Sequence, residues 1–395
     1  MPNPPARDAR LTRLARWMLA LGTIAALFHL AGLESPSTPP RHIVLLSLGP
    51  EAARTLAAAE AGADRTPELA SFLSEVSFFR RAIAQADTKG PALRSLFTGR
   101  YPTTTLTPHG PLPAPDLATE LKAAGFRTAA FVSPDVPSEH AEPGGGIRAD
   151  FDLWQDDAPD LATRAAAARR WLAETGDERS FLFFEAGDAQ AAASLSAGMD
   201  ALRATELLDS SLLVVFAPTA AQTGEPERRL AAQTVHVPLA FRMPHHERRR
   251  FDAMVEMIDV APTIHGLAGL PRPQGLRGRD LSARIRHGGA LEADRIAYAQ
   301  HGFGDGAHTG LHGDLQLLVD RATGEARLFH LGEGFESAPA PLNAYPFRRG
   351  YLRRNMKQRL EESVADRRTL HAPGSPPEDA PAPADAAVAG GGEGG

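Results

Sequence analysis

Residues 89–102 form the sequence Lys89-Gly90-Pro91-Ala92-Leu93-Arg94-Ser95-Leu96-Phe97-Thr98-Gly99-Arg100-Tyr101-Pro102. This stretch has the features of a short helix with both ends marked. Pro91 suits the first helical turn, where a backbone N–H would have no partner. Gly99 can adopt the left-handed conformation that ends a helix, and Pro102 prevents the helix from resuming. The N-terminus of such a helix presents unpaired N–H groups and partial positive charge, so it is a natural place for an anion.

Apolar runs lie on both sides of this helix and alternate with helical segments. Most of the runs are continuous, which is typical of strands buried on both faces of a parallel sheet. The predicted strands are 42–48, 78–85, 127–133, 181–184 and 211–217. Predicted helices between them include 118–124, which Gly125 closes, and 162–175.

Residues 89–102 also resemble the nucleophile segment of the sulfatases, in the alkaline phosphatase superfamily. In that family a Cys or Ser that is converted to formylglycine opens a Cys/Ser-x-Pro-Ser-Arg-x-Ser-Leu-Leu-Thr-Gly-x-Tyr-Pro run, and some relatives keep a Ser or Thr. The matching residues of this chain are Pro91, Ser95, Leu96, Thr98, Gly99, Tyr101 and Pro102.

Further segments resemble the same family, and the resemblance covers about residues 41–335. They are 66–73, 117–132, 234–242, 257–270 and 275–281. The resemblance implies a three-layer α/β/α sandwich with a mostly parallel central sheet. It also implies a small C-terminal antiparallel sheet, built from strands 297–299, 315–320 and 326–331. A ligand crevice is then expected at the carboxyl ends of the parallel strands.

The positions that carry the family's chemistry hold other residues here. Lys89 stands at the nucleophile position. The aligned metal-binding positions are occupied by Gly49, Pro50, Thr219 and Ala220. The absence of cysteine excludes a Cys-derived formylglycine. Metal-assisted ester hydrolysis needs hard oxygen ligands and a nucleophile, so we predict no catalytic, cofactor-binding or metal-binding residue and no cofactor.

One alternative keeps hydrolysis open. An alignment shifted by one residue places Thr88 at the nucleophile position. Asp87 or Asp188 would then have to supply carboxylates beside Thr88 after folding. If they form a tight oxygen shell there, the prediction of inactivity fails.

Lys89 itself has two interpretations. It is a solvated lysine in a loop that has lost its function, or its ammonium replaces the lost metal charge. In the second case, Lys89 and the N–H groups of the following helix would bind a sulfate- or phosphate-type anion without hydrolysing it.

The histidines are interpreted mainly as structural or exposed residues. His236 and His265 lie within strand and helix patterns. His245 and His246 precede an arginine run and favour an exposed charged loop over a metal site. His301, His308 and His312 occupy a glycine-rich stretch that turn geometry explains, with a three-histidine metal site as the alternative.

The composition is that of a soluble globular protein, with 43% hydrophobic and 23% charged residues. The net charge of −6 argues against a nucleic-acid partner.

Four arginines, at 7, 10, 13 and 16, precede the apolar run 17–33. As a helix this run would span roughly 25 Å, so we expect an uncleaved membrane anchor, with a cleaved signal as the alternative. The arginines would keep that end cytoplasmic, which predicts a single-pass protein of the bacterial inner membrane with a periplasmic domain.

The predicted organisation has five parts. They are an anchor and linker over 1–40, a sulfatase-like domain over 41–290, a small-sheet subdomain over 291–346, a charged helix over 347–371 and a disordered tail over 372–395. Basic residues from Arg348 to Lys357 make a solvated helix face, or contact anionic lipid or a partner.

The favoured function is a non-hydrolytic binding or assembly protein with an unknown protein partner. The alternative is a divergent sulfuric or phosphoric ester hydrolase.

Overall fold

A computed structural model describes residues 39–63, 65–107, 110–111, 114–134, 136, 151–187, 191–220, 230–244, 246–292, 294–301 and 306–370. The described residues from Arg41 onward form one compact unit. The predicted anchor and the predicted tail from residue 372 onward lie outside the described residues.

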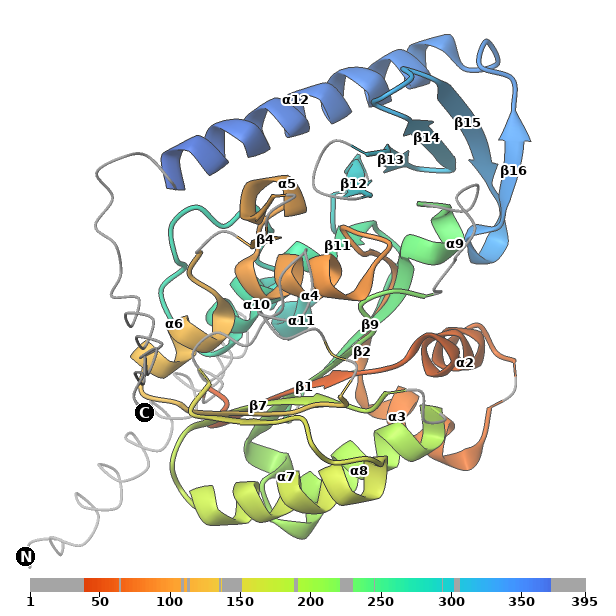
Figure 1. Ribbon diagram of the computed structural model, residues 1–395. Coiled ribbons are helices and arrows are strands. Elements are labelled where there is room, and N and C mark those ends of the chain that lie inside the picture. Colours follow the sequence, from red (N-terminus) through yellow and green to blue (C-terminus); the bar gives the residue numbers. More distant parts are fainter. Residues whose placement is uncertain are drawn as a thin grey trace, which may run out of the picture. The chain divides into compact units, whose positions relative to one another are not determined.

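The described strands form one large mixed sheet in the order β10-β2-β9-β8-β1-β7-β5-β6, with β11 also paired to β2 (Figure 1). The strands are β1 His42–Ser47, β2 Ser77–Ile83, β5 Arg127–Phe131, β6 Leu153–Gln155, β7 Ser180–Glu185, β8 Ser211–Phe216, β9 His236–Arg242, β10 Arg250–Phe251 and β11 Val255–Glu256. Only β9 runs antiparallel to its neighbours in this described sheet. The carboxyl ends of β1, β2, β5, β7 and β8 therefore meet at one edge, as predicted.

Helices cover both faces of the large sheet. On one face α2 Pro50–Glu60, α3 Pro67–Glu75, α7 Leu161–Thr175 and α8 Ala191–Ala204 contact one another. On the other face lie α4 Lys89–Thr98, α6 Leu117–Ala123, α10 Val260–Leu267 and α11 Ser282–His287 (Figure 1). Shorter elements are α5 Pro102–Thr105, α9 Ala232–Val235, η1 Leu208–Ser210, η3 Met257–Asp259, η4 Glu333–Phe335 and the β3–β4 pair Leu106–Thr107 and Gly110–Pro111. This arrangement confirms the predicted three-layer architecture.

A second, antiparallel sheet has the order β12-β13-β14-β15-β16. Its strands are β12 Ala297–Gln300, β13 His308–His312, β14 Leu315–Val319, β15 Ala326–Leu331 and β16 Ser337–Ala340. This small sheet was predicted from the sequence, but its strands β13 and β16 were not. The sequence of β13 contains His308, Gly310 and His312 and therefore has no apolar run that would predict a strand.

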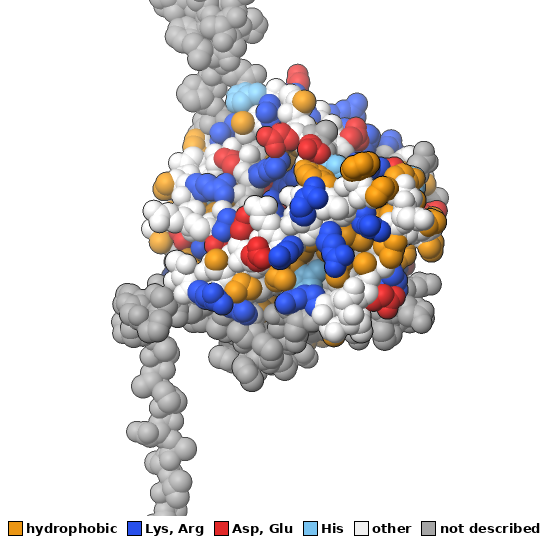
Figure 2. All heavy atoms as spheres, turned by 90° about the horizontal axis from the view of Figure 1, so that it is seen from above, with side chains coloured by type: hydrophobic (Ala, Val, Ile, Leu, Met, Phe, Trp, Pro, Cys, Tyr) orange, Lys and Arg blue, Asp and Glu red, His pale blue; other side chains and the backbone are white. Residues whose placement is uncertain are grey.

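The long helix α12 Pro346–Leu370 packs on β13 and α5. Leu352 and Met356 lie against Gly310 of β13, and the Thr104 hydroxyl of α5 donates to the Ser363 carbonyl of α12. Figure 2 looks down on this face and shows Lys and Arg side chains spread across it. Arg353, Arg354 and Lys357 are exposed, whereas Arg348 pairs with Asp314. The exposed residues agree with the interpretation as a solvated helix face.

The prediction of a transmembrane protein is corrected. Along the described part of the chain, no helix has both the length and the apolar character needed to cross a membrane. The one long helix, α12, is too rich in arginine. The apolar run 17–33, on which the prediction rested, lies outside the described residues. We therefore do not propose a membrane anchor.

Candidate functional site

The helix α4 begins at Lys89 and ends at Gly99, which has φ 59° and ψ 24° in the left-handed region. The C-terminal end is where the sequence predicted it, whereas the helix starts two residues before Pro91. Its first turn contains no acidic residue. A cation at the start of a helix is unfavourable because the N-terminus already carries partial positive charge. A negative charge from elsewhere in the fold would offset this.

Glu185 supplies that negative charge from the end of β7. Its Oε1 atom lies 3.0 Å from Lys89 Nζ, with the Glu185 side chain fully buried and the Lys89 side chain 16% exposed. The other carboxylate oxygen accepts from the Ser133 backbone N–H at 3.2 Å and contacts the Ser133 hydroxyl. The interpretation of Lys89 as a solvated lysine is therefore wrong.

The backbone around Glu185 is held by a buried arginine from α7. Arg164 Nε donates to the Glu185 carbonyl at 3.2 Å, and Arg164 Nη2 donates to the Ala186 carbonyl at 3.2 Å. A Cβ on Gly187 would lie 3.3 Å from Arg164 Nη2, and Gly187 has a φ of 67°. The end of β7 is thus built to hold the Glu185 carboxylate in one place.

A second acidic side chain at this edge, Asp87, is paired with histidine. His301 Nδ1 donates to the two Asp87 oxygens at 2.9 and 3.0 Å, and the Leu230 N–H donates to Asp87 Oδ2 at 3.3 Å. The backbone of Gln300 pairs with that of Gln85 at 3.0 Å, which brings His301 beside Asp87. The predicted alternative of an oxygen shell from Asp87 is not what the described contacts give.

The residues that align with the family's metal ligands, and the alternative nucleophile Thr88, follow the carboxyl ends of strands. Gly49 is the extended N-cap of α2, and Pro50 is that helix's first residue. Thr219 is buried after β8, and the Ala220 N–H donates to the Thr234 carbonyl at 3.0 Å. Thr88 is the exposed N-cap of α4 and makes no side-chain cap hydrogen bond. Asp188 lies outside the described residues.

The residues described at this edge do not fit the divalent cation that the fold family implies. Such an ion needs several oxygen ligands with negative charge. Glu185 already pairs with an ammonium, which would repel a second cation, and Asp87 pairs with His301. Within the described ranges, no group of three or more His, Asp or Glu side chains is placed to hold a metal.

The other histidines are dispersed. His308 contacts the Tyr298 hydroxyl, and His312 Nε2 lies 2.6 Å from Asp294. Together with His301 they therefore have three separate partners and form no three-histidine site. His265 donates to the Ala261 carbonyl at 2.9 Å within α10, as expected of a packed residue. His245 lies outside the described residues.

His236 is the other packed histidine. Its Nε2–H donates to the Arg80 carbonyl at 2.7 Å, and its ring stacks on Phe335 with centroids 3.9 Å apart. Burial lowers the pKa of His236 to about 4. Its ring is therefore neutral at physiological pH.

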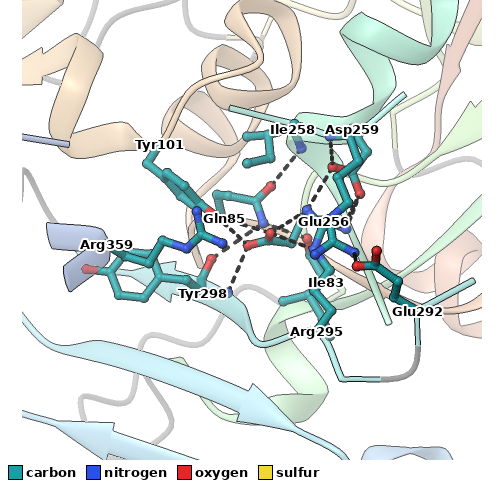
Figure 3. Close-up of polar contacts among 12 residues, drawn as sticks. Ile83, Gln85, Tyr101, Glu256, Ile258, Asp259, Glu292, Arg295, Tyr298 and Arg359 are labelled. Atoms are coloured by element: carbon teal, nitrogen blue, oxygen red, sulfur yellow. Dashed lines mark hydrogen bonds and ion pairs between the residues drawn. The ribbon is translucent and has the colours of Figure 1, made fainter. Parts of the chain in front are cut away.

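A buried ionic cluster lies next to Tyr101, the tyrosine of the opening stretch (Figure 3). Arg295 Nη2 lies 2.6 Å from Glu256 Oε2 and 2.8 Å from Asp259 Oδ1. The Tyr101 hydroxyl donates to Glu256 at 3.0 Å, and the Tyr298 N–H donates to Glu256 Oε1 at 2.9 Å. Burial and the Glu256 carboxylate raise the pKa of Tyr101 well above its usual value. Burial alone would lower the pKa of Arg295, but Asp259 and Glu256 raise it.

The sequence analysis missed Glu185, Ser133 and Arg295. Glu185 is the last residue of the apolar strand β7. A charged residue at the carboxyl end of a buried strand, where the crevice was expected, could have identified it as a site residue. Ser133 and Arg295 gave no local signal, because their roles depend on partners 52 and 36 residues away in sequence.

Searches for known relatives give matches in structure but not in sequence. No protein-family model and no curated protein matches the chain. A protein of the alkaline phosphatase superfamily from Vibrio parahaemolyticus is similar over 84% of this chain and 88% of its own, with a TM-score of 0.63 and 16% identity. A phosphonate monoester hydrolase of Agrobacterium radiobacter matches over 82% and 96%, with a TM-score of 0.65 and 14% identity. A 2-O GAG sulfatase matches over 84% and 94%, with a TM-score of 0.65 and 12% identity. These similarities confirm the fold that the resemblance implied.

Proposed function

We propose that this chain, which has the fold of the alkaline phosphatase superfamily, is a non-hydrolytic binding or assembly protein. The observation that carries the proposal is the 3.0 Å contact between Lys89 Nζ and Glu185 Oε1. It places a paired ammonium at the position that aligns with the family's nucleophile. A protonated amine has no lone pair with which to attack an ester.

The electrostatics of the crevice support the same proposal. The ammonium satisfies the buried carboxylate of Glu185, and the carboxylate offsets the positive charge of Lys89 and the α4 N-terminus. A bound divalent cation would have to separate this pair. The residues that align with metal ligands offer no carboxylate to compensate for that loss.

The test is turnover together with metal content. The purified full chain is assayed with aryl sulfate and aryl phosphate esters, with and without added Ca²⁺ and Mg²⁺, and bound metal is measured by mass spectrometry. The proposal predicts turnover no faster than in buffer and metal well below one equivalent. Metal-dependent turnover that Lys89→Ala leaves intact would establish a hydrolase instead.

A sulfate- or phosphate-type group is the ligand class that we propose for the α4 N-terminus. Such an anion would contact Lys89 and the unpaired N–H groups, but Glu185 competes with it for the ammonium. In sulfate-dependent thermal shift, Glu185→Gln should therefore respond more strongly than the wild type, and Lys89→Ala more weakly. Equal responses of wild type and Lys89→Ala would remove this ligand from the proposal.

One observation favours the alternative of a divergent hydrolase. A histidine oriented by a carboxylate is the arrangement that activates hydroxyl nucleophiles. His301 is paired with Asp87, and Asp87 directly precedes the exposed Thr88 in the chain. If this pair works on an ester, both Thr88→Ala and His301→Gln abolish turnover while Lys89→Ala does not. A periplasmic location and the division of residues 41–371 into three parts stay predictions.

A further inference from the structure

The edge of the large sheet is irregular at Arg80 and Arg81. Phe79 pairs with Leu239 and Ala82 with Val237, so β2 advances by three residues where β9 advances by two. This is a β-bulge, and the residue of β9 opposite it is Pro238, which has no N–H to donate. Bulges of this kind redirect side chains, and here the redirected residues are two arginines.

The strand on the other side of β2 is interrupted at the same level. β10 pairs with Phe78 and Phe79, and β11 pairs with Ala82 and Ile83. The connecting residues Asp252–Met254 make no ladder with β2, opposite the bulge. A cavity of about 340 Å³ lies here, and it is also lined by residues 289–291.

The cavity lining combines apolar side chains with the charged residues Arg81, Arg250 and Asp252. Phe251 and Met254 are buried lining residues, and Ala290 and Leu291 lie toward its rim. The volume falls within the range of small-molecule sites. None of the lining residues belongs to the crevice around Lys89, so this is a separate site.

Arg81 is the lining cation without a carboxylate within ion-pair distance among the described residues. Its Nη2 donates to the Gly313 carbonyl, and its guanidinium lies 5.2 Å from the Phe335 ring centroid. These contacts fix the side chain and leave Nε and Nη1 without a described partner. Burial lowers the pKa of Arg81, an effect that the more distant Asp314 and Asp252 oppose.

The charged side chains next to Arg81 form ion pairs with one another or with Glu60. Arg80 lies 3.0 Å from Glu60 and 3.2 Å from Asp252, and Arg250 lies 2.6 Å from Glu60. Asp252 lines the cavity, but its carboxylate pairs with Arg80 and its side chain is 75% exposed. Arg81 therefore lines a partly apolar cavity and has guanidinium donors without a described partner.

We propose that this cavity binds a small organic carboxylate with a compact apolar body. The carboxylate would accept hydrogen bonds from the Arg81 guanidinium, whose planar fork matches it in geometry. The apolar body would lie against Phe251, Met254 and Leu291. The inference is independent of the function proposed for the strand-end crevice.

The test uses benzoate as the probe and benzamide as its neutral counterpart of the same shape. Isothermal titration of the full chain should show saturable benzoate binding and at least about tenfold weaker benzamide binding, as expected for a charge-assisted contact. Arg81→Gln should weaken benzoate binding by about tenfold or more and abolish the preference over benzamide. Arg353→Gln is the control, because Arg353 is an exposed arginine of α12 that does not line the cavity. It should bind benzoate like the wild type.

Ala290→Glu gives a second variant at an exposed position, where folding tolerates a larger side chain. Its carboxylate should pair with Arg81 or repel the probe, and so weaken benzoate binding without removing Arg81. Circular dichroism checks that each variant is folded, and Ala290→Glu decides the question if Arg81→Gln is not. The proposal is overturned if benzoate does not bind the wild type. It is also overturned if Arg81→Gln and Arg353→Gln bind benzoate equally, or if Ala290→Glu binds like the wild type.

Discussion

Glu185 determines what Lys89 can do, although the two residues are far apart in the sequence. A lysine at the first position of a helix would normally extend into solvent, away from the positive end of the dipole. Here the end of β7 holds a fully buried carboxylate at 3.0 Å. An isolated buried carboxylate would be costly, so each charge explains the presence of the other.

His236 allows a prediction of pH dependence at the same scale. Its pKa is about 4 in the folded protein and ordinarily 6.5. Between these values the unfolded chain binds a proton that the folded chain does not, so stability falls as the pH drops from about 6.5 to about 4. His236→Gln keeps a donor for the Arg80 carbonyl and removes this proton. Urea unfolding across this range should therefore show a shallower decline for the variant, and parallel curves would contradict the assignment.

At the scale of elements, α4 depends on how Gly99 ends it. Gly99 has a φ of 59°, and a Cβ there would lie 2.8 Å from Leu276 Cδ2 and 3.6 Å from Ala261 Cβ. The residue must therefore be glycine for two reasons, its conformation and the close approach of a neighbouring segment. The segment that contains Leu276 is close enough to Gly99 for the Arg277 N–H to donate to the Gly99 carbonyl at 2.8 Å.

Gly99→Ala and Gly125→Ala separate these two reasons. Gly125 has a φ of 84° and no neighbour within 4 Å of an added Cβ. Gly125→Ala should cost about 1 kcal/mol, the conformational term alone. Gly99→Ala should cost about 1 kcal/mol more, because the neighbour must also move. The measurement is the free energy of unfolding in urea, and equal losses would show that the contact with Leu276 is unimportant.

The elements were predictable where a local signal defines them. Pro91 and Gly99 marked α4, and Gly99 has the left-handed conformation expected at the end of that helix. The apolar runs located β1, β7 and β8 to within a residue or two of their ends. The candidate site was less predictable, because Lys89 pairs with Glu185, and Asp87 with His301, across long separations. The Arg81 cavity depends on a bulge and an interrupted edge strand, and neither has a signature in the sequence.

At the scale of the whole described molecule, the cluster around Arg295 links the two sheets. Glu256 ends β11 in the large sheet, and its carboxylate accepts from the backbone of Tyr298 in β12 of the second sheet. Arg295 compensates both Glu256 and Asp259, with all three side chains almost completely buried. Removal of the guanidinium would leave two uncompensated carboxylates in the interior.

Arg295→Met should therefore destabilise the protein by about 3–5 kcal/mol. Arg279→Met is the matched control, because Arg279 pairs at 2.9 Å with Glu292 and both side chains are well exposed. Its loss should be below about 1 kcal/mol. Chemical denaturation monitored by far-ultraviolet circular dichroism gives both values. Similar losses for the two variants would show that the buried cluster does not hold the sheets together.

The most direct test of the proposed site is a double-mutant cycle on Lys89 and Glu185, measured as free energies of unfolding in urea. Lys89→Met and Glu185→Gln should each be destabilising by about 2–4 kcal/mol, because each leaves its partner unpaired. The double variant should lose at least about 1 kcal/mol less than the two single losses combined. Strictly additive losses would contradict the account, since Lys89 and Glu185 would then not form the ion pair that occupies the nucleophile position.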